Sequence, residues 1–187
     1  MADARIDQPA LAVLSSLAWK TALWIGLPWL WLARGGSDTR EVRRVVGLDR
    51  FDRRAGWWTL ATLAGGAAWW AVAAAVTGRG PTLEPLALVS LWWGAAVCEE
   101  VLCRGFLLGA LRRGGTGPVA AIAISTVVFV LAHLPGWVAI SHLSVEEIAT
   151  RSVTVGVIGV VAALLRLGSG SLVPSILFHG IADMIAT

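Results

Sequence analysis

Residues 85–111 read PLALVSLWWGAAVCEEVLCRGFLLGAL, an apolar stretch with Glu99, Glu100 and Arg104 inside it. An α-helix needs about 20 apolar residues to cross the hydrocarbon core of a bilayer, and this stretch is longer. Charged side chains inside a span are costly, so they usually pair, line a cavity or take part in chemistry. The stretch therefore predicts a membrane helix that carries a functional group of charges.

The composition of the whole chain agrees with this interpretation. The 187 residues are 57% hydrophobic and 14% charged, whereas soluble domains have about 45–50% and about 25%. Such a chain cannot cover a soluble surface, and it is too apolar to be disordered. Its two cysteines exclude a disulfide scaffold. The net charge of +3 is weak, and we expect no nucleic-acid partner.

Five further apolar segments are candidate spans: 11–33, 57–77, 118–134, 152–167 and 172–187. Together they predict an all-α, polytopic transmembrane helix bundle of about six spans. We expect residues 1–84 to hold N-terminal spans with a basic cytoplasmic loop, and residues 85–187 to hold the charged motifs. The first span is expected to be retained, because MADARIDQPA lacks the basic n-region of a signal peptide.

Basic residues predict the orientation of the bundle. Seven arginines lie within residues 34–56, and the positive-inside rule places such a loop in the cytoplasm. Alternation of the spans then brings Arg112, Arg113 and Arg166 to the same side. Residues 40–56 have two interpretations that the sequence leaves open: an amphipathic helix attracted to anionic lipid, or a basic loop that only fixes topology.

The two adjacent glutamates of the third span face different directions. Glu100 and Arg104 are four residues apart, so they share a helix face and can form a buried ion pair. Glu99 is rotated from Glu100 by about 100° and cannot easily share that arginine. We therefore interpret Glu99 as a member of a reactive site.

Other spans supply partners for Glu99. His133 ends the apolar run of the fourth span, and His179 and Asp183 lie four residues apart in the last. Three helices can therefore converge on one polar site. Lys20, in the first span, either extends to the membrane surface or lines the same cavity.

Two histidines with carboxylates suit metal-assisted hydrolysis or direct general acid–base catalysis of water attack. His133, His179 and one carboxylate would supply three ligands to a catalytic zinc ion, although the sequence has no HExxH motif. Cys98 and Cys103 are interpreted as small apolar helix residues, and Ser169 as part of a turn rather than a nucleophile. A small transporter or ion-binding protein, or a non-catalytic membrane scaffold, could use the same residues.

Three motifs follow one another in separate predicted spans: Glu99-Glu100-x-x-x-Arg104, Phe129-x-x-x-His133 and His179-x-x-x-Asp183. In this order they resemble the CPBP family, which comprises type II CAAX prenyl endopeptidases and bacteriocin-processing enzymes, intramembrane proteases of an all-helical fold. The resemblance covers residues 85–187 and implies a catalytic transmembrane core there.

The resemblance also implies a role for each matching residue. Glu99 would be the catalytic carboxylate that activates water, with His133 as its partner at the same water or metal. His179 and Asp183 would complete the catalytic site by stabilising the oxyanion or by ligating the metal. The supporting pair would be Glu100 and Arg104.

These roles predict an endopeptidase that hydrolyses a peptide bond at or within the membrane. Zinc or another divalent metal would bind His133, His179 and Asp183, and a metal-free glutamate mechanism is equally compatible. The expected partners are a peptide or membrane-protein substrate and the lipid bilayer. We expect an integral membrane protein of a bacterial cell membrane, since Lys20 is the only lysine among 15 basic residues, a skew typical of GC-rich genomes.

Geometry within the spans gives three further expectations. His133 lies near the outer end of its predicted span and His179 near the inner end of its own, so their depths differ by roughly 10 Å unless helices tilt. Pro135 is expected to end the fourth helix. The glycines Gly105, Gly109, Gly156 and Gly159 are expected to allow close helix approach.

Overall fold

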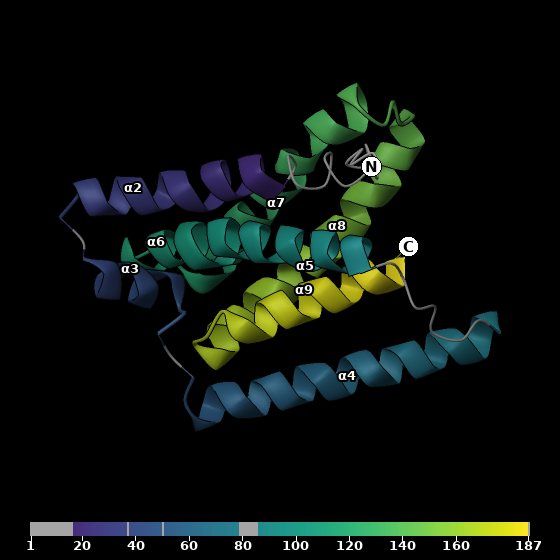
Figure 1. The fold of residues 1–187 in the computed structure, drawn as a ribbon, viewed down its shortest axis with the longest axis horizontal. Helices are drawn as coiled ribbons and strands as arrows, with labels where there is room; N and C mark the ends of the chain where they lie inside the picture. Colours follow the sequence, from purple (N-terminus) through teal and green to yellow (C-terminus); the bar gives the residue numbers. More distant parts are fainter. Residues whose placement is uncertain (1–16, 37, 50, 79–85, 187) are drawn as a thin grey trace, which may run out of the picture.

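The computed structural model describes residues 17–36, 38–49, 51–78 and 86–186, and within these ranges every regular element is a helix. The predicted all-α fold is therefore confirmed for this part of the chain (Figure 1). Residues 1–16, with the start of the first predicted span and the segment before it, lie outside the described ranges. The elements in chain order are the π-helix η1 Thr21–Gly26, α2 Leu27–Arg34, α3 Thr39–Val46, α4 Arg53–Thr77, α5 Leu86–Glu100, the π-helix η2 Val101–Leu107, α6 Leu108–Arg113, α7 Pro118–Ala139, α8 Val145–Ser169 and α9 Val173–Ala186.

Among the described residues, three helices are long and apolar enough to cross a membrane: α4 over Arg53–Val76, α7 and α8. The predicted count of six spans is not confirmed. Helix α9 has 14 residues, which at about 1.5 Å per residue reach only about 21 Å. The predicted span 85–111 is divided among α5, η2 and α6, with the charged residues in its middle. Helix α9 packs against α4, α5 and α8.

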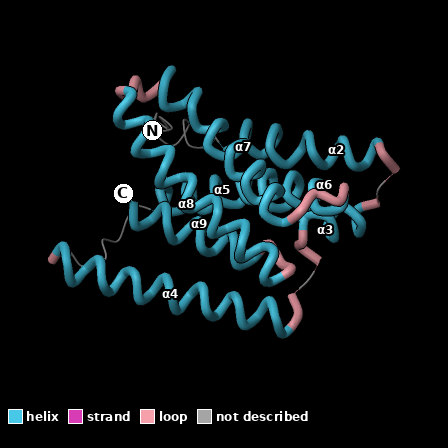
Figure 2. Tube along the Cα trace, turned by 180° about the vertical axis from the view of Figure 1, so that it is seen from behind, coloured by secondary structure: helices cyan, strands magenta, loops and turns pink. Residues whose placement is uncertain are grey.

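Apolar side chains cover the outside of this bundle, while several charged side chains lie inside it. Helix α4 runs along one edge (Figures 1 and 2) and exposes Trp57, Trp69 and Val76. A soluble protein has the opposite distribution, whereas lipid solvates an apolar surface. This distribution and the three apolar helices indicate an integral membrane protein. Among the described residues, the buried carboxyl, guanidinium and imidazole side chains are those of Glu99, Glu100, Arg104 and His179.

Helix α3 packs closely against η2 and α6. Its valines Val42, Val45 and Val46 are buried. A Cβ added at Gly105 would lie 2.6 Å from Val46 Cγ1, and one at Gly109 would lie 2.8 Å from the Val45 carbonyl oxygen. The close approach predicted for these glycines is therefore present, and its partner is α3. Segment 40–56 thus begins as a helix whose apolar face contacts protein.

Two helix boundaries differ from the predictions. Helix α7 continues through Pro135 to Ala139, because a proline removes only one backbone hydrogen bond and the following turn still closes. Helix α8 begins at Val145 rather than 152, because Ser144 and Glu147 form a capping box that stabilises an earlier start. Both helices therefore extend further towards the loop that joins them than predicted.

A compact turn joins α8 to α9. Ser169 and Ser171 are buried in it. The Ser169 hydroxyl donates to the Ser171 carbonyl oxygen at 2.8 Å and accepts from the Ser171 backbone N–H at 3.0 Å. Ser175 Oγ donates to the Ala162 carbonyl oxygen at 2.8 Å, which ties α9 to α8. These bonds fix where α9 begins and hence the height of its polar residues.

Candidate active site

Two π-helical segments begin beside the same polar cluster. Glu99 and Glu100 are the last residues of α5, directly before η2, and Lys20 directly precedes η1. Such widened turns are frequent at functional sites. Thr21 Oγ1 and Cys98 Sγ lie 3.6 Å apart and connect the two helices at this level. The N-terminal helix therefore contributes to a cluster whose other members all follow residue 98.

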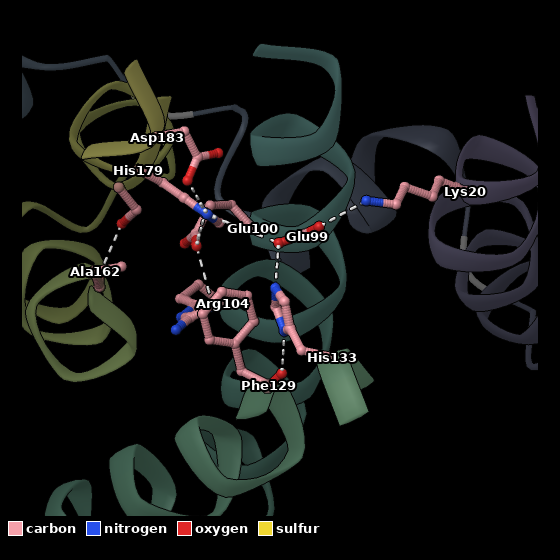
Figure 3. Close-up of polar contacts among 10 residues, drawn as sticks. Lys20, Glu99, Glu100, Arg104, Phe129, His133, Ala162, His179 and Asp183 are labelled. Atoms are coloured by element: carbon pink, nitrogen blue, oxygen red, sulfur yellow. Dashed lines mark hydrogen bonds and ion pairs between the residues drawn. The ribbon is translucent and has the colours of Figure 1, made fainter. Parts of the chain in front are cut away.

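The Glu99 carboxylate lies at the centre of the cluster (Figure 3). Lys20 Nζ donates a hydrogen bond to Oε1 at 3.0 Å. Oε2 lies 3.5 Å from His133 Nε2 and 3.7 Å from His179 Nε2. These two distances exceed a direct hydrogen bond, and contacts of this length are commonly bridged by water. Lys20 thus holds one carboxylate oxygen while the other faces both imidazoles.

Glu100 binds two donors on one oxygen. Its Oε1 accepts from Arg104 Nη1 and from His179 Nδ1, each at 3.0 Å. The Glu100 and Arg104 side chains are both 0% exposed, and a buried charge of this kind requires a partner. The pair predicted from the four-residue spacing is present. In addition, Glu100 orients the imidazole of His179.

Hydrogen bonds to the two imidazoles indicate their tautomers. His133 Nδ1 lies 2.8 Å from the Phe129 carbonyl oxygen, which can only accept, so we assign the hydrogen to Nδ1. His179 Nδ1 faces the Glu100 carboxylate in the same way. Nε2 of each ring is then the nitrogen that faces Glu99 and can take up or release a proton.

The ring of Phe129 packs against both imidazoles and against Arg104. Its centroid lies 4.9 Å from that of His133 and 5.4 Å from that of His179, both edge-to-face. The Arg104 guanidinium carbon lies 4.1 Å from the same centroid. Gly159 makes room for this group, because a Cβ there would lie 2.9 Å from Arg104 Nη2. Phe129 therefore helps to hold both imidazoles and the Arg104 guanidinium group in position.

One side of the cluster is open. The side chains of Lys20, His133 and Asp183 are 20%, 23% and 28% exposed, whereas those of Glu99 and His179 are 6% and 4% exposed. Asp183 Oδ1 lies 3.6 Å from His179 Nε2. Water and substrate would therefore approach Glu99 from the side of these three residues.

The predicted convergence of helices is present in the structure. His133 and His179 both lie within 3.7 Å of one oxygen of Glu99, so the mismatch in depth expected from the predicted spans does not occur. The catalytic roles of Glu99, His133, His179 and Asp183 remain predictions. Cys98 and Cys103 are free and buried, as small apolar helix residues would be.

The predicted metal site lacks a matching arrangement of ligands. Within the described ranges, no group of three or more His, Cys, Asp or Glu side chains is arranged to hold a metal ion. Glu99 already has a cation on Oε1, the Lys20 ammonium group. The ligand set of His133, His179 and Asp183 therefore remains a prediction.

The sequence left open whether Lys20 reaches the membrane surface or lines the cavity, and it did not predict the packing of Phe129 against the histidines. A lone lysine in an apolar span is a signal for function, but its partner depends on how the first helix docks. The contacts of Phe129 depend on α7 facing η2 and α9 together. Trp137, 5.4 Å from the His133 ring, was also not anticipated.

Comparison with known proteins gives one match. A family model described as type II CAAX prenyl endopeptidase Rce1-like matches residues 81–185. The matched part contains Glu99, His133, His179 and Asp183 and leaves out Lys20. No curated protein and no solved structure matches the chain.

Proposed function

The chain belongs to the type II CAAX prenyl endopeptidase Rce1-like family, and we propose that it is an intramembrane endopeptidase with Glu99 as the catalytic base. The observation that carries this proposal is the position of Glu99 Oε2, 3.5 Å from His133 Nε2 and 3.7 Å from His179 Nε2. A buried carboxylate between two imidazoles can accept a proton and pass it on.

The first step is attack by water. A water bound between Glu99 Oε2 and His133 Nε2 would be polarised by both groups. Glu99 takes a proton from this water, and the resulting hydroxide adds to the carbonyl carbon of the scissile peptide bond. Lys20 supports the step, because its hydrogen bond leaves Oε2 as the oxygen that faces the water.

The second step is collapse of the tetrahedral intermediate. With His179 protonated, its Nε2–H donates to the oxyanion while Nδ1–H donates to Glu100. The nearby carboxylates of Glu100 and Asp183 favour the positive charge on that ring. Glu99 then gives its proton to the leaving amine nitrogen as the C–N bond breaks, and the carboxylate is regenerated.

The Glu100–Arg104 pair acts on the reaction through His179. Arg104 compensates the charge of Glu100 inside the bundle, and the same Glu100 oxygen holds His179 Nδ1. Without this bond the imidazole could rotate and Nε2 would leave the Glu99 carboxylate. Each step therefore uses side chains of this chain alone.

Cleavage of a diverse peptide panel by the purified protein in lipid vesicles tests this proposal. We expect cleavage by the wild type and its loss in Glu99→Gln, which keeps the side-chain shape but removes the base. A chelator arm tests the metal, and we expect the rate with chelator to equal the rate without it. Retained cleavage in Glu99→Gln would overturn the role of Glu99.

A second measurement separates the rival functions. If the polar cluster served transport, Glu99→Gln would abolish ion or solute uptake into the same vesicles. If the protein were a scaffold in which the cluster served only packing, the substitution would not change uptake. Peptide cleavage that depends on Glu99 in protein without uptake activity supports the endopeptidase. Uptake that depends on Glu99 in protein without cleavage would support the transporter instead.

A further inference from the structure

A second charged site has Arg104 in its lining and no histidine. Helices α3, α6 and α8 line an open cavity of about 350 Å³, within the range of about 300–1,000 Å³ typical of small-molecule sites. Its lining residues include Glu41, Arg44, Arg104, Arg112, Arg113 and Arg166. The cavity is therefore unusually rich in guanidinium groups for the surface of an apolar bundle.

The positive charge of this cavity is only partly compensated, since five arginines and one carboxylate, that of Glu41, line it. Arg104 is paired with Glu100 and contributes no free charge. Arg44 Nε lies 3.7 Å from Asp49 Oδ2, and one nitrogen of Arg112 donates to the Thr116 carbonyl oxygen. Each guanidinium has five N–H donors, so these contacts leave most of the donors of Arg44 and Arg112 available.

The fold builds the cavity from three separate segments. Gly105 and Gly109 let α3 approach η2 and α6, which brings Arg44 near Arg113. Gly47 ends α3 in a left-handed conformation, φ +81°, and its missing side chain leaves room for the guanidinium group of Arg166. Arginines that are far apart in the sequence therefore line the same cavity.

The cavity lies where two candidate spans reach one end of the bundle. Arg112 and Arg113 come just before α7, which begins at Pro118, and Arg166 is in the last turn of α8. Helix α3 lies at the same end (Figure 1). Apolar side chains, among them Leu108 and Leu167, line the rest of the cavity. This combination of a basic and an apolar lining suits an amphipathic ligand.

We propose that the cavity between α3, α6 and α8 binds the phosphate headgroup of an anionic phospholipid through Arg44, Arg112 and Arg113. Guanidinium groups bind phosphate oxygens in bidentate geometry. Basic pockets between membrane helices recognise lipid headgroups by the same chemistry. A free phosphate ion would use the arginines as well, but it would leave the apolar lining without a partner.

Thermal unfolding in nanodiscs tests the proposal. The wild type is measured in phosphatidylcholine with increasing amounts of phosphatidylglycerol, and we expect its melting temperature to rise as the ligand binds the folded state. The cavity variant is Arg112→Gln/Arg113→Gln. The matched control is Arg53→Gln/Arg54→Gln, which removes the same charge from two exposed arginines at the start of α4.

The control should keep the rise in melting temperature, and the cavity variant should lose it. Each arginine near an anionic lipid surface contributes about fivefold in affinity, so the cavity variant should bind phosphatidylglycerol about thirtyfold more weakly. Arg44→Gln, an exposed side chain on α3, gives a second variant if the double variant is unstable in phosphatidylcholine alone. Equal responses of cavity variants and control would overturn the proposal, because they would indicate only general attraction to the membrane.

A separate arm identifies the source of the phosphate. Inorganic phosphate and glycerol phosphate are added to the wild type in phosphatidylcholine nanodiscs. We expect no rise in melting temperature at concentrations where phosphatidylglycerol gives one. An equal rise with soluble phosphate would overturn the assignment to a lipid headgroup.

Discussion

Lys20 Nζ donates a hydrogen bond to Glu99 Oε1 at 3.0 Å, across 79 positions of sequence. Lys20 lies outside the part of the chain that the family model matches, and Glu99 lies within it. The ammonium group compensates the charge of a side chain that is only 6% exposed. The N-terminal helix therefore contributes a charged group to the polar cluster.

Replacement of Lys20 tests this contribution. We expect Lys20→Met to lower kcat by about tenfold to hundredfold. A positioned general base supplies a rate acceleration of about 10²–10⁴-fold, and Lys20 would contribute only part of it. KM should change little, because the hydrogen bond of Lys20 acts on the base Glu99 and the expected loss is in the activation of water. Lys20→Arg keeps the charge and should recover part of the rate.

Thr21→Val is a matched control for Lys20. Thr21 is the next residue after Lys20. Its replacement by valine removes the contact of Thr21 Oγ1 with Cys98 Sγ but keeps the hydrogen bond from Lys20 to Glu99. The kcat of Thr21→Val should stay within about twofold of the wild type, because the loss of one weak contact away from the carboxylate has only a small effect. Full activity of Lys20→Met, or an equal loss in Thr21→Val, would remove Lys20 from the site.

The Glu100–Arg104 pair gives a prediction about stability. Arg104→Ala leaves a fully buried carboxylate with one partner fewer, and the free energy of unfolding should fall by about 3–5 kcal/mol. Arg104→Met/Glu100→Gln removes both charges at similar volume and should recover much of this loss. Thermal unfolding in lipid measures both variants, and a double variant as unstable as Arg104→Ala would contradict the charge argument.

The double variant should nevertheless cleave slowly. A neutral glutamine side chain in place of Glu100 can no longer stabilise a protonated His179. Stability and catalysis would then separate: the melting temperature recovers while kcat does not. A double variant with both recovered would restrict Glu100 to a packing role.

The motifs of the C-terminal half predicted much of the candidate site. Helical spacing alone paired Glu100 with Arg104 and turned Glu99 away from them, and the structure has both features. Spacing could not reveal that Glu100 also holds His179, because that bond depends on the docking of α9 against α5. The same holds for Lys20, whose partner is set by a contact between distant helices.

The span count depended on apolar length, which does not reveal where a helix widens or ends. Glu99 and Glu100 of the third predicted span end α5 and Arg104 lies in the π-helix η2 that follows, and the last predicted span is a helix of 14 residues. Pro135 was expected to end α7, but loss of one hydrogen bond near a helix end is tolerated. Local signals therefore predicted the fold class better than the boundaries.

Two glycines of α8 should respond differently to substitution. A Cβ at Gly159 would lie 2.9 Å from Arg104 Nη2 and 3.0 Å from Thr126 Cγ2, whereas at Gly156 the nearest atom, on Val130, is 3.9 Å away. Gly159→Ala should lower the free energy of unfolding by about 1–3 kcal/mol. Gly156→Ala should be neutral or stabilise by up to about 1 kcal/mol, because alanine favours a helix.

Thermal unfolding of the two variants in the same lipid measures this difference. Gly159→Ala should also lower kcat, because displacement of Arg104 disturbs Glu100 and through it His179. Equal melting temperatures for both variants would mean that the close contact at Gly159 does not constrain the guanidinium group.

Substitution of Ser169 should lower stability and leave cleavage unchanged, whereas substitution of Glu99 should do the reverse. This contrast distinguishes a serine nucleophile from a carboxylate base. The Ser169 hydroxyl is buried and bonds within the turn before α9. Ser169→Ala leaves the Ser171 N–H without this acceptor, so the free energy of unfolding should fall by about 1–3 kcal/mol, while kcat per folded molecule stays unchanged. Glu99→Gln should keep the fold and lose cleavage. Loss of cleavage in fully folded Ser169→Ala would instead make that hydroxyl part of the reaction.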